Sequence, residues 1–184
     1  FYPGKNLGAL GDGGAVITTN RVVAEKVRTL GNYGSKVKYY HQYQGVNSRL
    51  DSLQAAILNI KLNYLDKWNA QRKIIAQSYL GNISNPLVKL PEINPDNNPV
   101  WHIFAVLVED RATFIEYLNK HGIATNIHYP VAMHLHEAYN NLGYQKGDFP
   151  VAEYISEHEV SLPLYYGMKE EEIAYVISII NAYE

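Results

Sequence analysis

Apolar residues recur with the period of a helix through the middle of the chain. Between residues 51 and 80 they stand at spacings of three, four or seven positions. These apolar residues are Leu53, Ile57, Ile60, Tyr64, Trp68, Ile75 and Tyr79. The pattern predicts one long amphipathic helix. Such length is unusual in a globular domain, so the helix is expected to join two lobes or to form an interface.

The residues before this helix predict a strand, a shorter helix and an aperiodic stretch. Residues 15–19 are a short β-rich run that follows a glycine-rich turn, which predicts a strand. Asn20 is a suitable N-cap for a helix over residues 21–30, and Gly31 is expected to end it. Residues 31–49 have no period and are rich in Gly, Tyr, His and Asn, which is typical of functional or mobile segments.

A change of composition at residues 81–99, which contain four prolines, predicts a boundary. After this boundary strands alternate with helices. Residues 100–108 and 123–129 predict strands, and Asp110 and Gly122 are expected to begin and end the helix between them.

The last helix is expected over residues 169–183. Its buried stripe is predicted to consist of Ile173, Val176, Ile177 and Ile180. Alternating strands and helices in about half the chain predict an α/β or α+β lobe. The expected organisation is therefore residues 1–50, a connecting helix at 51–80, and an α/β domain at 81–184.

Composition excludes several classes of protein. Of the 184 residues 47% are hydrophobic, so a disordered tail is not expected. The chain has no cysteine, so a disulfide scaffold is not expected either. The formal charge of −2 and the lack of a basic run argue against nucleic acid as a partner. No apolar stretch approaches the roughly 20 residues that a membrane crossing needs, so a cytoplasmic protein is expected.

Lys5 is the first candidate for chemistry. It lies between a Pro-Gly turn and the glycine-rich residues 8–14. A lysine held by rigid backbone in apolar surroundings can act as an amine nucleophile. From spacing alone, a solvated lysine is the simpler interpretation.

Two other clusters have competing interpretations. Backbone N–H groups of residues 11–14 could bind a phosphate, but the glycine spacing favours a hairpin turn. His128, His134, His136 and Glu137 could bind zinc, but their spacing is not that of a helical ligand pair. A strand end at residues 128–130 that contacts a polar ligand is the preferred interpretation, and no metal is expected.

Asn47 and Arg49 precede the long helix. An amide and a guanidinium at a helix start could bind a carboxylate or phosphate. Alternatively, Asn47, Ser48 or Asp51 serves as a cap and Arg49 pairs with an acid.

Taken together, three motifs resemble one family. They are Phe-Tyr-Pro-Gly-Lys-Asn-Leu-Gly at 1–8 with Gly-Asp-Gly-Gly at 11–14, Gly-Val-Asn-Ser-Arg-Leu-Asp-Ser-Leu-Gln-Ala-Ala at 45–56, and His-Tyr-Pro at 128–130. In order and spacing the chain resembles the C-terminal half of the DegT/StrS family of nucleotide-sugar aminotransferases. The resemblance implies an α/β, fold type I, pyridoxal phosphate (PLP)-dependent transferase. Residues 1–50 would then end its large domain, and 81–184 would form its small domain.

The resemblance also implies roles for single residues. Lys5 matches the lysine that binds the cofactor, and Asn47 matches an asparagine that reaches the cofactor phosphate of a neighbouring subunit in a homodimer. Arg49 matches an arginine whose expected ligand is the donor carboxylate. Tyr2, His128 and Tyr129 match residues near the sugar.

The implied reaction transfers an amino group from glutamate to a keto sugar of a nucleoside diphosphate, closest to a dTDP-linked 3-keto-6-deoxyhexose. Since the chain starts at Phe1 without an initiator Met, a preceding half with other cofactor contacts is expected, and the isolated chain is expected to show little or no turnover. Two alternatives stay open. One is a non-catalytic or sugar-nucleotide-binding half, and the other is a PLP-dependent dehydratase or regulator. Dehydratases of this type have histidine where this chain has Lys5.

Overall fold

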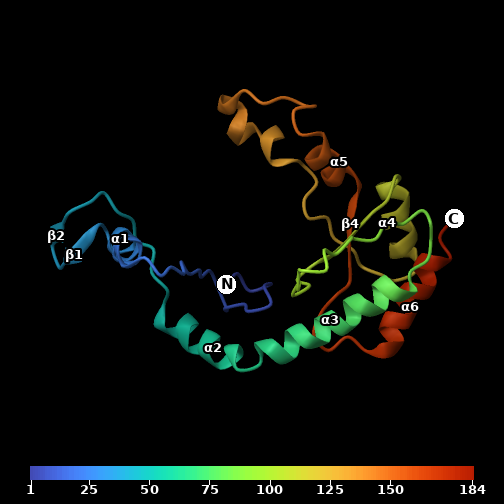
Figure 1. Cartoon of the computed structure of the whole chain (residues 1–184), viewed down its shortest axis with the longest axis horizontal. Helices are drawn as coiled ribbons and strands as arrows, with labels where there is room; N and C mark the ends of the chain where they lie inside the picture. Colours follow the sequence, from blue (N-terminus) through green and yellow to red (C-terminus); the bar gives the residue numbers. More distant parts are fainter. The chain divides into compact units, whose positions relative to one another are not determined.

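The computed structural model describes residues 1–184, which divide into two compact units, Phe1–Lys67 and Trp68–Glu184. Helices and short strands make the chain an α/β protein (Figure 1). No helix is both long enough and apolar enough to cross a membrane.

The first 20 residues of the first unit are irregular, so the predicted strand at 15–19 is wrong. Val16 and Ile17 are 63% and 97% exposed, and this run pairs with neither of the two strand pairs. A strand needs a partner for its backbone hydrogen bonds, and high β-propensity does not replace one. The predicted hairpin turn at residues 11–14 is wrong for the same reason.

Helix α1 (Arg21–Gly31) begins where the sequence predicted. The Asn20 side-chain oxygen accepts hydrogen bonds from the N–H groups of Val22 and Val23 at 2.9 and 3.3 Å. The helix includes Gly31, one residue beyond the predicted end. A Cβ there would lie 2.5 Å from the Ser48 carbonyl oxygen, so glycine lets the segment before α2 approach the helix end.

The aperiodic residues 31–49 contain a small hairpin of β1 (Ser35–Val37) and β2 (Tyr40–His41). Gly34 has φ +73°, and a Cβ there would lie 1.8 Å from the Tyr43 carbonyl oxygen. Only glycine fits this crossing of two backbone segments.

The predicted single helix at 51–80 is instead two helices, α2 (Ser52–Leu62) and α3 (Leu65–Asn82). The side-chain amide of Asn63 donates to the carbonyls of Asn59 and Ile60 at 3.0 and 3.3 Å. It competes for acceptors that a continuous helix would use, and the Tyr64 N–H bonds Lys61 instead. The interruption follows from this local competition. The proposed three-part domain division stays a prediction.

The core of the second unit is built around two antiparallel strands, β3 (Phe104–Leu107) and β4 (Glu159–Leu162), paired from Phe104 opposite Leu162 to Leu107 opposite Glu159. β3 is shorter than the strand predicted at 100–108. The strand predicted at 123–129 is wrong, since this segment makes only a single bridge between Asn126 and Ser161.

Three helices cover these strands, namely α3, α4 (Arg111–Lys120) and α6 (Glu170–Asn181) (Figure 1). Asp110 begins α4 as predicted by accepting from the Thr113 N–H at 3.0 Å, and Gly122 follows the helix with φ +72°. Of the predicted α6 stripe, Ile173, Val176 and Ile180 are buried and Ile177 packs against the core.

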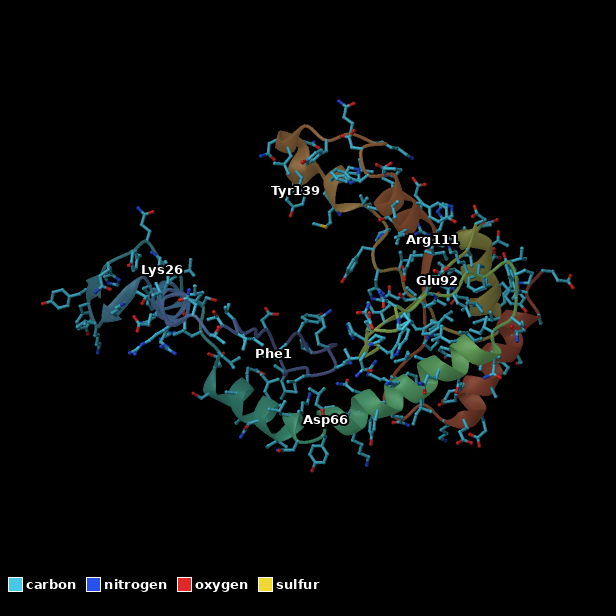
Figure 2. The ribbon with its side chains drawn as sticks, viewed as in Figure 1. Phe1, Lys26, Asp66, Glu92, Arg111 and Tyr139 are labelled. Atoms are coloured by element: carbon cyan, nitrogen blue, oxygen red, sulfur yellow. The ribbon has the colours of Figure 1, made fainter.

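Residues 133–158 form three further elements that the sequence did not predict: η1 (Met133–Leu135), η2 (Glu137–Leu142) and α5 (Pro150–His158). η1 and η2 lie apart from α3, α4 and α6, and Tyr139 marks this segment in Figure 2. Side chains 137–149 are exposed, so the segment depends on polar contacts more than on a core.

Candidate functional site

Lys5 lies on a closed loop. Its N–H donates to the Tyr2 carbonyl at 2.9 Å, and the Ala9 N–H donates to the Phe1 carbonyl at 2.8 Å. A Cβ on Gly8 would lie 2.2 Å from the Pro3 carbonyl oxygen, so only glycine lets the loop close. The Lys5 and Tyr2 side chains are exposed. The exposed Lys5 agrees with the solvated lysine that spacing alone favoured, and its proposed role in chemistry stays a prediction.

Helix α2 fastens the loop. Lys61 Nζ donates to the Gly8 carbonyl at 2.6 Å, and the Leu10 N–H donates to Gln54 Oε1 at 2.7 Å. The structure thus joins the motif at 1–14 to the motif at 45–56. Gln54 was not predicted as a positioning residue, although it belongs to the second motif.

Asn47 and Arg49 are held by the end of α1. The N–H groups of Val46 and Ser48 donate to the carbonyls of Leu30 and Gly31 at 2.8 and 2.9 Å. Arg49 Nε donates to Asn47 Oδ1 at 3.3 Å. The Arg49 guanidinium also lies 5.6 Å from the Tyr33 ring centre, within the range of a cation–π contact.

These contacts do not support a cap or an acid partner in this segment, and the anion site stays a prediction. Arg49 takes part in none of the ion pairs of the structure, and Asp51, the N-cap of α2, makes no side-chain capping bond. Asn47 and Arg49 line a cavity of about 740 Å³ together with residues 12–16. An amide and a guanidinium facing one cavity can bind an anionic group.

His128 and Tyr129 belong to the second unit. Tyr129 is 64% exposed, and His128 is half-buried. The preceding segment is held against β4, because Asn126 and Ser161 exchange backbone hydrogen bonds at 3.2 and 2.8 Å. His128 therefore follows a bridge to β4 rather than the end of a strand.

Two buried polar residues that the sequence did not indicate contact His128. The His128 N–H donates to Glu159 Oε2 at 2.6 Å, and His128 Nδ1 lies 2.7 Å from Ser161 Oγ. Ser161 in turn donates to Glu159 Oε1. The alternation of polar and apolar residues in Glu-Val-Ser-Leu at 159–162 is a strand signal that could have placed both residues on one face.

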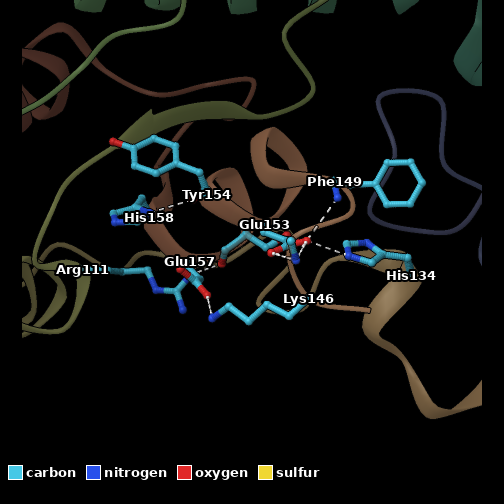
Figure 3. A network of polar contacts seen from close by, with 10 residues as sticks. Arg111, His134, Lys146, Phe149, Glu153, Tyr154, Glu157 and His158 are labelled. Atoms are coloured by element: carbon cyan, nitrogen blue, oxygen red, sulfur yellow. Dashed lines mark hydrogen bonds and ion pairs between the residues drawn. The ribbon is translucent and has the colours of Figure 1, made fainter. Parts of the chain in front are cut away.

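The histidines considered for zinc are not brought together. No three His, Asp or Glu side chains form a group that could bind a metal. His134 Nε2 instead lies 2.9 Å from Glu153 Oε1, with both side chains only 8% exposed (Figure 3).

Glu153 also accepts from the Gly147 N–H at 2.8 Å and the Phe149 N–H at 3.2 Å. Burial alone would raise the pKa of this carboxyl, but the backbone N–H groups and His134 lower it below its ordinary value. Glu153 thus fastens the segment of η1, η2 and α5 and is not a ligand site.

Comparison with known proteins gives one consistent family. The model of the DegT/DnrJ/EryC1/StrS aminotransferase family matches residues 1–181. The chain is 49% identical to dTDP-3-amino-3,6-dideoxy-alpha-D-galactopyranose transaminase of Aneurinibacillus thermoaerophilus over all of this chain and 54% of the relative. It is 48% identical to the erythromycin biosynthesis sensory transduction protein EryC1 of Saccharopolyspora erythraea, over 99% of this chain and 50% of that protein.

Solved structures agree. The crystal structure of Streptomyces venezuelae DesV in complex with a ketimine intermediate matches with a TM-score of 0.94 and 44% identity, covering 98% of this chain and 49% of DesV. NtdA of Bacillus subtilis, solved with the bound cofactor PMP, matches with a TM-score of 0.85 and 31% identity over 98% of this chain and 43% of NtdA. The chain therefore spans about half the length of the relatives it matches.

Proposed function

Since the chain belongs to the DegT/DnrJ/EryC1/StrS aminotransferase family, we propose that it forms part of a PLP-dependent enzyme that transfers an amino group from glutamate to a keto sugar of a nucleoside diphosphate sugar. The observation that supports this most is the agreement of family and geometry at Lys5. The family match includes the whole loop, and the loop presents a lysine side chain to solvent on a backbone closed by Gly8. Two relatives at 47% and 49% identity are named as transaminases of dTDP-linked amino sugars.

The residues present fit a cofactor with an aldehyde and a phosphate. Lys5 offers a primary amine on a closed loop, and Asn47 and Arg49 offer hydrogen-bond donors for an anion from the lining of a cavity that also includes the carboxylates of Asp12 and Asp51. When bound, PLP supplies an electron sink for the carbanion that forms at the donor Cα. In our proposal Lys5 binds the cofactor and carries the proton that leaves the Cα of glutamate.

The other side chains bind and orient. We assign Asn47 to the cofactor phosphate of a neighbouring subunit in a homodimer, and Arg49 to the carboxylate of glutamate, which suits a planar guanidinium. Tyr2, His128 and Tyr129 are assigned to the sugar nucleotide. Each presents a polar group on an exposed or half-buried side chain.

A dehydratase or regulator on the same scaffold is the alternative, and two relatives at 48% and 41% identity are named for sensory transduction and regulation. Lys5 favours transamination, because a lysine amine both binds the cofactor and returns the proton.

The test uses the full-length polypeptide that contains this chain. The protein is incubated with PLP, reduced with borohydride and mapped by peptide mass spectrometry, and the formation of 2-oxoglutarate from glutamate is followed with a dTDP-linked keto sugar. We expect the adduct on the peptide with Lys5, and loss of both adduct and activity in Lys5→Ala. Lys67→Ala, which removes an exposed lysine from α3, is the matched control and should keep both. An adduct elsewhere, or an active Lys5→Ala variant, would overturn the proposal.

A further inference from the structure

Three side chains of the second unit form a hydrogen-bonded chain that runs from a buried carboxylate to a cavity. Glu159 and Ser161 lie on β4 and are 1% and 5% exposed. Glu159 accepts from Ser161 Oγ and from the backbone N–H of His128. Ser161 Oγ also contacts the ring nitrogen Nδ1 of His128 at 2.7 Å. His128 and Ser161 line a cavity of about 250 Å³. A cavity of this size would hold one part of a ligand, such as a single sugar ring.

The direction of each hydrogen bond among Glu159, Ser161 and His128 follows from the number of hydrogens that each group carries. A carboxylate only accepts, and both oxygens of Glu159 are in use. The single hydroxyl hydrogen of Ser161 points to Glu159, so Ser161 Oγ can only accept from His128. His128 must therefore carry its hydrogen on Nδ1.

The other side of the ring leads independently to the same tautomer. The Ile127 N–H donates to Asn126 Oδ1 at 2.8 Å, which turns the amide nitrogen of Asn126 toward His128. Asn126 Nδ2 lies 3.3 Å from His128 Nε2. Since an amide nitrogen only donates, Nε2 must present a lone pair.

We propose that Glu159 and Ser161 are positioning residues that hold His128 as the Nδ1–H tautomer, so that its Nε2 accepts a hydrogen bond from a hydroxyl group of the sugar substrate. This inference rests on the proposed function, because that function brings a sugar to His128. The exposed amide of Asn126, at a long 3.3 Å, occupies the position that the hydroxyl would take. A fixed tautomer turns an ambiguous imidazole into a pure acceptor, and a ligand that offers no donor at that position is rejected.

Glu159→Gln provides the sharpest test, because it should reverse the direction of the hydrogen bonds from residue 159 through Ser161 to His128. The single oxygen of the Gln amide would accept from the backbone N–H of His128, and the NH2 group of the same amide would donate to Ser161 Oγ. Ser161 would then donate to His128 Nδ1 and shift the ring to the Nε2–H tautomer. Ser161→Ala removes the link and should leave a mixture of tautomers, because the remaining contact from Asn126 is long at 3.3 Å and too weak to hold one tautomer alone. Ser161→Thr keeps the hydroxyl and should keep Nδ1–H.

The tautomer is read from the 15N chemical shifts of protein labelled with [15N]histidine. His121 is the internal reference, since its Nδ1 lies 2.8 Å from the Tyr117 carbonyl, an acceptor that requires Nδ1–H in every variant. An unchanged His121 signal also shows that the end of α4 is intact. If Glu159→Gln does not fold, the proposal is tested by comparing the His128 tautomer in Ser161→Ala with that in Ser161→Thr. A wild-type protein with Nε2–H at His128, or Ser161→Ala with an unchanged tautomer, would overturn the positioning role.

Kinetics of the full-length enzyme test the link to the sugar. Loss of one oriented acceptor should raise KM for the nucleotide sugar about tenfold in Glu159→Gln, while the half-reaction with glutamate stays unchanged. An altered tautomer with an unaltered KM would overturn the inference and leave the proposed function standing. A wild-type enzyme without transamination would overturn the proposed function, whereas the tautomer measurement would still report on Glu159 and Ser161.

Discussion

The two units of this chain are stabilised in different ways. In Trp68–Glu184 one cluster of buried side chains, including Tyr79, Phe104 and Phe114, connects three helices with two strands. In Phe1–Lys67 the apolar side chains of Ile17 and Ile60 are 97% and 63% exposed, and the loops are held by hydrogen bonds and close glycine contacts. Within these 184 residues, apolar burial holds the second unit together, whereas the first unit is held by hydrogen bonds and close glycine contacts.

This difference explains where the candidate residues lie. The loop of Lys5 has a defined shape without a core beneath it, because Gly8, Gln54 and Lys61 close and fasten it. His128, in contrast, is oriented by polar residues that are buried within the packed unit. Positioning by hydrogen bonds leaves side chains accessible, which a ligand site requires.

The largest difference between the units should come from truncating one large apolar side chain in each. Phe104→Ala in β3 should cost about 3–5 kcal/mol of unfolding free energy, because Phe104 is fully buried. In the same 184-residue chain Ile17→Ala should cost almost nothing, because Ile17 is 97% exposed in it. Urea unfolding of both variants measures this, and comparable losses would contradict the contrast between the units.

A smaller but functionally important effect is expected in the Lys5 loop. In Gly8→Ala the new Cβ would lie 2.2 Å from the Pro3 carbonyl oxygen, so the loop must open and displace Lys5. A displacement of about 1 Å at a reacting group can cost roughly 10²-fold in rate, and this loss is expected in kcat of the full-length enzyme.

Gly81→Ala is the matched control, since nothing lies within 4 Å of its Cβ position in α3 and the rate should be retained. Equal rates for both variants would show that loop closure does not position Lys5.

Helix caps should have the same moderate effect in both units. Asn20→Ala removes the oxygen that accepts from Val22 and Val23, and Asp110→Ala removes the acceptor of the Thr113 N–H. Each should lower the free energy of unfolding by about 1 kcal/mol. Denaturant titrations check this, and an effect confined to Asp110→Ala would mean that α1 contributes nothing to the stability of the chain.

The smallest effect should be a dependence of stability on acid pH. The folded-state pKa of Glu153 lies below its ordinary value of 4.5, so its contribution is present above about pH 4.5 and is lost as pH falls through the folded pKa. Glu153→Gln should therefore be less stable than the wild type at pH 7, and the difference should shrink in acid. Thermal unfolding across pH measures this, with the exposed Glu137→Gln as control. A constant difference between pH 7 and pH 3 would contradict the role of the carboxylate.

The elements that the sequence predicted correctly are those with local causes. Asn20 and Asp110 begin α1 and α4 through bonds to residues two or three positions ahead, and the α6 stripe follows from helical spacing. The strands predicted at 15–19 and 123–129 were wrong, because a strand exists only where a partner pairs with it. The break at Asn63 was missed, because a polar residue inside an otherwise regular pattern can either continue a helix or compete for its carbonyls.

For the candidate site, the sequence by itself determined the family and the residues that we propose for its chemistry, since the motifs around Lys5, Asn47 and His128 are local and ordered along the chain. Only the tertiary structure decided which residues position them. Gln54 and Lys61 lie 44 and 53 positions from the groups they bind, and Ser161 lies 33 positions from His128. Contacts over such separations depend on how the chain folds back on itself, which local spacing does not specify.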